Sequence, residues 1–199
     1  MIKAFLHLVL FALMGVAAKA QPTSYADLIQ DYQANYVAHH EVVKGEDRQF
    51  FRFFPANATY KTFAKFIDLK DPTGFMMATS GKSQQQFFRY GLLKFKIAGG
   101  SYQLTVYRSK ALLNDPDYKD YLFVPFTDKT SGEESYGGGR YIDLRTTQIT
   151  KYGVWLDFNK AYNPYCAYSK GFNCPIPPIE NDLPMAIHAG EMDFAKQSH

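Results

Sequence analysis

Long hydrophobic runs are scarce in this sequence, and the most prominent one lies close to the N-terminus. Ala4–Ala18 is almost entirely apolar, about the length of a signal-peptide core and short for a membrane span of roughly 20 residues. Lys3 precedes this run, and Ala18-Lys19-Ala20 follows it as a small-x-small cleavage pattern. We therefore expect a signal peptide over residues 1–20 that is cleaved before Gln21. An uncleaved N-terminal anchor is the alternative.

Neither positive nor negative charge predominates once that segment is removed. Lys3 and Lys19 leave with it, so 22 basic residues become 20 against 19 acidic ones. No run of Lys and Arg survives to form a stripe that would bind a polyanion. We expect no nucleic-acid partner, no membrane span after signal removal, and a single β-rich domain over residues 21–199 working outside the cytoplasm.

Cysteine is nearly absent, since Cys166 and Cys174 are the only two. In a protein outside the cytoplasm such a pair favours a disulfide bond. Free thiols and a metal pair are the alternatives, although the nearest histidine, His188, is not at ligand spacing. We expect no metal and no cofactor.

The residues after the expected cleavage site have the pattern of one amphipathic helix. Ser24 is a suitable N-cap with Asp27 at the third helical position. Apolar residues then recur at helical spacing at Tyr25, Leu28, Ile29, Tyr32, Tyr36 and Val37. This pattern predicts a helix over residues 24–40 that packs through its tyrosines.

From Phe50 onward the hydrophobic period changes to two, which is typical of strands. The clearest stretch is Leu93–Val106, for which Gly99-Gly100 is the expected hairpin tip. That tip pairs Ile97 with Tyr102, Phe95 with Leu104 and Leu93 with Val106, and places all six on one face. Further strands are expected at Tyr60–Leu69, Tyr121–Phe126, Gly139–Leu144, Gln148–Phe158 and Leu183–Ala189, with weaker patterns at Phe75–Thr79 and Phe50–Phe54.

One helix followed by six to eight short strands predicts a mainly β fold, either an antiparallel β barrel or a curved sandwich. Residues 159–182 break the strand pattern with four prolines and the cysteine pair. An irregular segment of this length is usually functional or disordered, and the restraints favour order. We expect a long ordered Pro-rich loop that covers the β domain.

Several runs in the chain resemble the bacterial and archaeal family catalogued as domain of unknown function 1684. These runs are Leu122–Asp128, Glu134–Tyr141, Asp157–Pro164, the Cys166/Cys174 pair, Cys174–Pro178, Glu180-Asn181 and Ala189–Glu191. The resemblance spans essentially the whole chain after residue 20. It implies no particular reaction, because the family has no assigned activity.

Two groups of polar residues are candidates for a binding site. Gly137-Gly138-Gly139 would let backbone N–H groups approach an anion beside Arg140, unless Arg140 pairs internally with Asp143 or Asp157. Asp157, with its neighbours in the Pro-rich loop, would make an oxygen-rich site, unless these side chains only cap backbone groups. The residues expected to contact a ligand are Asp128, Tyr136, Arg140, Asp157, Asn159, Tyr162, Asn163, Glu180 and Asn181.

Catalytic motifs are missing, because His39, His40, His188 and His199 stand in no nucleophile or metal pattern. We therefore favour a binding domain for a small polar or anionic molecule over an enzyme. A hydrolase using Asp157 and Glu180 as a carboxylate pair is the first alternative. A structural or partner-binding protein of the cell envelope is the second. The oligomeric state is left open.

Overall fold

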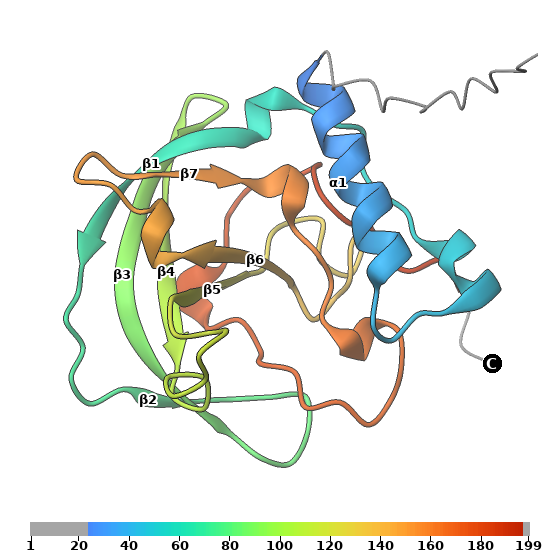
Figure 1. Cartoon of the computed structure of the whole chain (residues 1–199). Coiled ribbons are helices and arrows are strands. Elements are labelled where there is room, and N and C mark those ends of the chain that lie inside the picture. The colour runs from blue at the N-terminus through green and yellow to red at the C-terminus, as the bar shows by residue number, and fades with distance from the viewer. Residues whose placement is uncertain (1–23, 197–199) are drawn as a thin grey trace, which may run out of the picture.

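The computed structural model describes residues 24–196. The predicted signal peptide and its cleavage site lie outside the described residues. Figure 1 shows α1 beside a strongly curved antiparallel sheet that forms a nearly closed barrel, as the sequence predicted. The elements are α1 (Tyr25–His39), β1 (Lys61–Asp68), β2 (Phe75–Met77), β3 (Gln85–Ile97), β4 (Gly100–Ser109), β5 (Tyr121–Phe126), β6 (Arg140–Arg145) and β7 (Val154–Asp157).

The strand order along the sheet is β6-β5-β4-β3-β1-β7, with β2 paired to β3. The two ends of this order, β6 and β7, are successive in the chain, and this brings the sheet close to a closed barrel. Short 3-10 turns occupy Gly45–Phe50, Ala58–Tyr60, Thr146–Gln148, Phe158–Lys160, Tyr165–Ala167 and Ile179–Asn181.

Helix α1 begins where the sequence predicted. The Ser24 side chain accepts a hydrogen bond from the Asp27 backbone, and the Asp27 carboxylate accepts one from the Ser24 backbone. Ile29 is buried, whereas Leu28 is 53% exposed, so the packed face is narrower than expected. The helix packs on the turn that follows β7.

The β3–β4 hairpin has the predicted faces but a different tip. Its turn lies at Ala98-Gly99, both with positive φ (48° and 79°), so Phe95 pairs with Tyr102 and Leu93 with Leu104. Because the tip lies one residue earlier than predicted, each β3 residue pairs with a β4 residue two positions earlier than predicted. A shift of two positions leaves each side chain on its predicted face. The rings of Phe95 and Tyr102, 6.1 Å apart, stabilise this register and offset the roughly 1–2 kcal/mol cost of a left-handed alanine.

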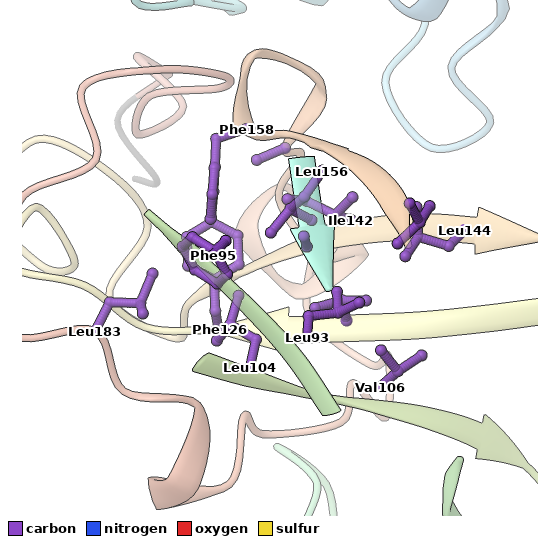
Figure 2. Packing of buried hydrophobic residues seen from close by; sticks show 14 of the residues in the cluster. Leu93, Phe95, Leu104, Val106, Phe126, Ile142, Leu144, Leu156, Phe158 and Leu183 are labelled. Atoms are coloured by element: carbon purple, nitrogen blue, oxygen red, sulfur yellow. The ribbon is translucent and has the colours of Figure 1, made fainter. Parts of the chain in front are cut away.

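The barrel interior holds the main hydrophobic core, shown in Figure 2. Leu93, Leu104 and Val106 of the hairpin are fully buried there. The Phe158 ring lies 5.7 Å from that of Phe95 and 5.3 Å from that of Phe126, and it fills the end of the barrel beside α1. Each such side chain contributes about 1.5–3 kcal/mol through burial.

A second aromatic cluster covers the outer face of the same sheet and consists of Met77, Phe87, Tyr107, Phe123 and Tyr141. Phe87 and Leu93 are an even number of residues apart on β3, so in a regular strand they would share a face. They lie on opposite faces of the sheet. The reason is a register irregularity between Arg89 and Gly91. The Phe66 ring closes over Gly91 so tightly that a Cβ there would lie 2.1 Å from it. The irregularity therefore creates an aromatic outer face.

Three predicted strands need correction. Gln148–Phe158 is a strand only over Val154–Asp157, because a turn bridges Thr150 to Gly153. Leu183–Ala189 is no strand, although it is mostly apolar, since the sheet order leaves it no neighbouring strand. Phe50–Phe54 forms only an isolated bridge at Phe53. The predicted strands Tyr60–Leu69, Phe75–Thr79, Tyr121–Phe126 and Gly139–Leu144 agree with the structure to within two residues at each end. The predicted hairpin Leu93–Val106 is longer in the structure, where β3 begins at Gln85 and β4 ends at Ser109.

Candidate functional site

Arg140, the residue expected to meet an anion, is completely enclosed. Its guanidinium pairs with Asp128 at 2.8 Å, and both side chains are 0% exposed. It also donates to the backbone carbonyls of Ile187, Ala189 and Glu191, at 2.9, 2.6 and 3.1 Å. Burial lowers the pKa of Arg140, while Asp128 opposes that shift. The ion-pair partner of Arg140 is therefore Asp128 and not Asp143 or Asp157. Through its three carbonyl acceptors, Arg140 holds residues 187–191 on the barrel.

Asp157 and Asn159 join the helix to the barrel. The Asp157 carboxylate accepts from the Tyr25 hydroxyl at 2.7 Å and from the Asn159 backbone and side-chain N–H groups at 3.1 Å. Asn159 also forms two hydrogen bonds with the backbone of Asn57, at 2.8 and 2.9 Å. These groups cap loop backbone and anchor the first turn of α1.

Glu180 and Asn181 lie on the other side of the barrel, against β3 and β4. Glu180 accepts from Arg89 at 3.2 Å and from the Tyr107 hydroxyl at 3.0 Å. The buried Asn181 amide bonds both backbone groups of Thr105, at 2.7 and 2.9 Å. Glu180 and Asp157 therefore have no partner in common, and the structure does not bring them together as the carboxylate pair of a hydrolase.

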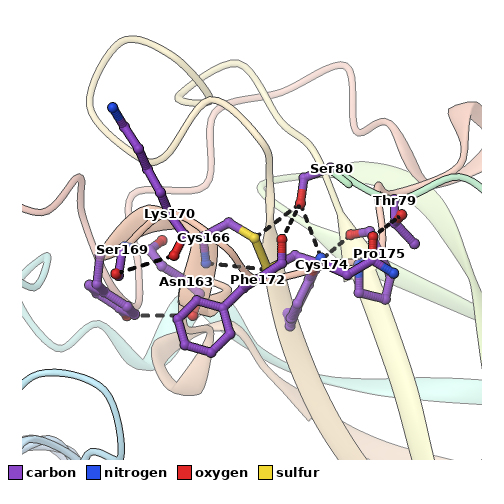
Figure 3. The surroundings of a disulfide bond; sticks show 12 residues. Thr79, Ser80, Asn163, Cys166, Ser169, Lys170, Phe172, Cys174 and Pro175 are labelled. Carbon is purple, nitrogen blue, oxygen red and sulfur yellow. Dashed lines mark hydrogen bonds between the residues drawn. A yellow bond between two sulfur atoms is a disulfide. The ribbon is translucent and has the colours of Figure 1, made fainter. Parts of the chain in front are cut away.

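The Cys166–Cys174 disulfide is present, as the sequence favoured (Figure 3). Ser80 holds it in place, since its hydroxyl contacts the Cys166 sulfur at 3.0 Å and accepts from the Cys174 backbone at 3.1 Å. The Ser80 backbone donates to the Cys174 carbonyl at 2.9 Å, and Thr79 forms a bridge with Pro175. The segment after β2 thus fixes the position of this part of the Pro-rich loop.

A cavity of about 680 Å³ lies between four parts of the chain. The aromatic outer face of the sheet forms one wall, the second half of α1 forms another, and residues 162–175 form the third. Residues 111–118, between β4 and β5, complete the lining. Seven tyrosines line it, namely Tyr32, Tyr36, Tyr118, Tyr121, Tyr141, Tyr162 and Tyr165. Of the nine residues expected to contact a ligand, Tyr162 alone lines this cavity. Tyr136, which is not among the lining residues, lies in the loop before β6.

Two carboxylates line this cavity, Glu41, which accepts from the Tyr165 hydroxyl at 2.7 Å, and Asp143. Asp143 lies on the wall formed by the sheet. Its Oδ1 accepts hydrogen bonds from the hydroxyls of Tyr121 at 2.8 Å and Tyr162 at 2.7 Å. Protein surrounds it on most sides, yet it is accessible to solvent because it faces the open cavity. Burial raises the pKa of Asp143, and the two hydroxyl donors oppose that shift. A carboxylate in such surroundings is a group that a ligand can contact.

A further carboxylate, Glu191, does not line the cavity but lies fully buried behind the tyrosines of α1. It accepts from the Tyr168 hydroxyl at 2.8 Å, from the Asn163 backbone at 2.9 Å and from the Tyr36 hydroxyl at 3.3 Å. Burial raises the pKa of Glu191 to about 7. Tyr36 thus links the cavity wall to a carboxyl group that titrates near neutral pH.

His40, in the wall formed by α1, is held neutral. Its Nδ1 accepts from the Val43 backbone at 2.9 Å, and burial lowers its pKa to about 4. Its Nε2 therefore carries the proton, and it has no hydrogen-bond partner within residues 24–196. The ring packs edge-on against Tyr36 and Tyr168.

Sequence reasoning missed Asp143, although one signal pointed to it. On the predicted strand Gly139–Leu144, Asp143 alternates with Ile142 and Leu144, so it had to face away from the barrel interior. No sequence pattern showed that α1 and residues 162–175 would enclose that face. Across residues 24–196, no cluster of three His, Cys, Asp or Glu side chains is arranged to hold a metal ion. No helix in this range is both long and apolar enough to cross a membrane.

Comparisons with known proteins identify the family. The chain is similar to an uncharacterised protein of Haloarcula marismortui solved by solution NMR, with 32% sequence identity and a TM-score of 0.62. The match covers 83% of this chain and 94% of the archaeal one. No curated protein matches the chain. A family model described as protein of unknown function (DUF1684) matches residues 49–192. The chain therefore belongs to the DUF1684 family.

Proposed function

We propose that the protein is an extracytoplasmic binding domain that holds a small molecule in the cavity between α1, the outer face of the sheet and residues 162–175. The observation that carries this proposal is the cavity itself, whose volume of about 680 Å³ falls within the roughly 300–1,000 Å³ of typical ligand sites. Its walls are mostly aromatic, and a few polar groups point to one place, at Asp143.

The way the walls are held also supports binding. The disulfide and Ser80 fix the third wall, while Tyr36 and Tyr168 bind Glu191 and fix the wall formed by α1. Walls that are already in position lower the conformational entropy that a ligand must overcome on binding.

The experiment is a titration with the neutral fluorescent probe 1-N-phenylnaphthylamine. Ser109 is buried and lines the cavity, so Ser109→Phe fills part of it. We expect the wild type to bind one probe with enhanced emission, and Ser109→Phe to bind at least about tenfold more weakly. Gln103→Phe, at an exposed position on the same strand, is the matched control and keeps wild-type affinity. Equal affinity of all three proteins would argue against this cavity as the binding site.

The proposed location rests on the disulfide and on the N-terminal sequence, because disulfides persist in oxidising compartments. Protein isolated from its own cells in the presence of an alkylating reagent should carry no label on Cys166 or Cys174, and its chain should begin at Gln21. Labelled cysteines together with an intact residue 1 would contradict an extracytoplasmic location.

A further inference from the structure

Apart from two histidines, the ionisable side chains that line the cavity are carboxylates and tyrosines. Asp143 and Glu41 are its acidic lining residues, and no Lys or Arg lines it. His40 adds no positive charge at neutral pH, because burial lowers its pKa to about 4. Lys44, beside the wall formed by α1, donates to the His40 backbone carbonyl at 2.8 Å. Arg140 is enclosed with Asp128, and Arg145 pairs with Asp120 at 2.7 Å.

The tyrosines add negative ring faces without adding charge. Burial raises the pKa of Tyr32 and of Tyr165 to about 12 and that of Tyr121 and Tyr162 well above its usual value, so these phenols stay neutral. Neutral aromatic rings attract cations through their faces. The structure already uses this attraction here, since the Arg145 guanidinium lies 5.7 Å from the centre of the Tyr121 ring.

Asp143 has one oxygen available for a partner. The two tyrosine hydroxyls both bind Oδ1, and within residues 24–196 no hydrogen bond reaches Oδ2. A protonated amine at this point would form a charge-assisted hydrogen bond with Oδ2 and contact the surrounding rings. The Phe87 and Phe123 side chains in the same cavity would accept an apolar body attached to that amine.

We infer that the cavity selects a small organic cation, an amine with an apolar or aromatic body, whose ammonium group pairs with Asp143. This deepens the proposed function and rests on it. The glycine-rich loop and Arg140 suggested an anionic ligand. A cationic ligand fits the structure better, because Arg140 is enclosed and Asp143 and Glu41 line the cavity.

The test compares three probes of nearly equal size by calorimetric titration at neutral pH: 2-phenylethylamine, 2-phenylethanol and phenylacetate. A charged hydrogen bond in a partly enclosed site contributes about 1.5–3 kcal/mol, so the amine should bind about 10- to 100-fold more tightly than the alcohol. Phenylacetate should bind most weakly.

Asp143→Asn keeps an acceptor for the two tyrosine hydroxyls but removes the charge. It should lose the preference for the amine while binding 2-phenylethanol and 1-N-phenylnaphthylamine as the wild type does, which also shows that the cavity is intact. Asp117→Asn, at an exposed position, is the matched control and keeps the preference.

The inference is overturned if amine and alcohol bind equally, if phenylacetate binds best, or if Asp143→Asn retains the preference. It is also overturned if none of the three probes binds while 1-N-phenylnaphthylamine does, an outcome that leaves the proposed function standing. Failure of 1-N-phenylnaphthylamine itself to bind would instead overturn the proposed function.

Discussion

Glu191 should make this protein less stable as the pH rises from acid to neutral. Its pKa is raised from 4.5 to about 7 in the folded state, because burial disfavours the charged form. Between these two values the folded state binds more protons than the unfolded state, so the free energy of unfolding falls with increasing pH. The stability that the protonated Glu191 contributes is fully present below about pH 4.5 and is lost as the pH rises through about 7.

The size of the effect follows from the shift. Each unit of pKa corresponds to about 1.4 kcal/mol, so a rise from 4.5 to about 7 gives a loss of about 3 kcal/mol. Other groups titrate in the same range and complicate the wild-type profile alone. His40, with its pKa lowered to about 4, acts in the opposite direction, because its charged form is disfavoured in the folded state.

The assay is therefore a difference between two proteins. Urea unfolding of the wild type and of Glu191→Gln, measured at several values between about pH 4.5 and 8, cancels the groups that they share. Gln keeps the hydrogen bond from the Asn163 backbone and cannot ionise. We expect the stability of the wild type relative to Glu191→Gln to fall by about 3 kcal/mol over this range. A difference that is independent of pH would refute the reasoning. Glu133→Gln, the same substitution at an exposed position, is the matched control.

Two further predictions concern the contacts that hold the cavity walls and the chain end. Asp128→Asn leaves the enclosed Arg140 charge without its partner and should lower the free energy of unfolding by about 3–5 kcal/mol, measured by urea unfolding. The exposed Asp117→Asn should change it by less than about 0.5 kcal/mol, and equal effects of the two substitutions would contradict this role for Asp128. Cys174→Ser removes the disulfide, which should cost about 2–3 kcal/mol and weaken 1-N-phenylnaphthylamine binding; unchanged affinity would show that the bond does not shape the cavity.

Much of the fold could be predicted because its signals are local. The Ser24–Asp27 capping box marks the start of α1, and alternation marks the faces of β3 and β4. The hairpin tip was misplaced because Gly99-Gly100 is the better turn by local preference, whereas contacts across the strands favour Ala98-Gly99. Leu183–Ala189 was mistaken for a strand because a buried irregular segment and a strand have the same apolar composition.

The candidate site was harder to predict because it depends on contacts between distant parts of the chain. The carboxylate partner of Arg140 is 12 residues away, on a loop, and its backbone carbonyl acceptors are 47 to 51 residues away. The cavity combines α1, β3 to β6 and the loop after β7, and no spacing in the sequence reports how these meet. Asp143 accepts hydroxyls from both Tyr121 and Tyr162, and nothing in the spacing of these three residues shows that they meet.

The Arg140 contacts also determine how early in synthesis the protein can complete its folding. Ile187, Ala189 and Glu191 supply carbonyl acceptors to the buried Arg140 guanidinium at the start of β6, and the Glu191 carboxyl group holds α1 through Tyr36. In a nascent chain that has not yet released residues 187–191, Arg140 can pair with Asp128 but lacks its three carbonyl acceptors. We expect folding to be completed only after residues 187–191 have left the ribosome, so that a segment far along the chain closes a structure that the helix began.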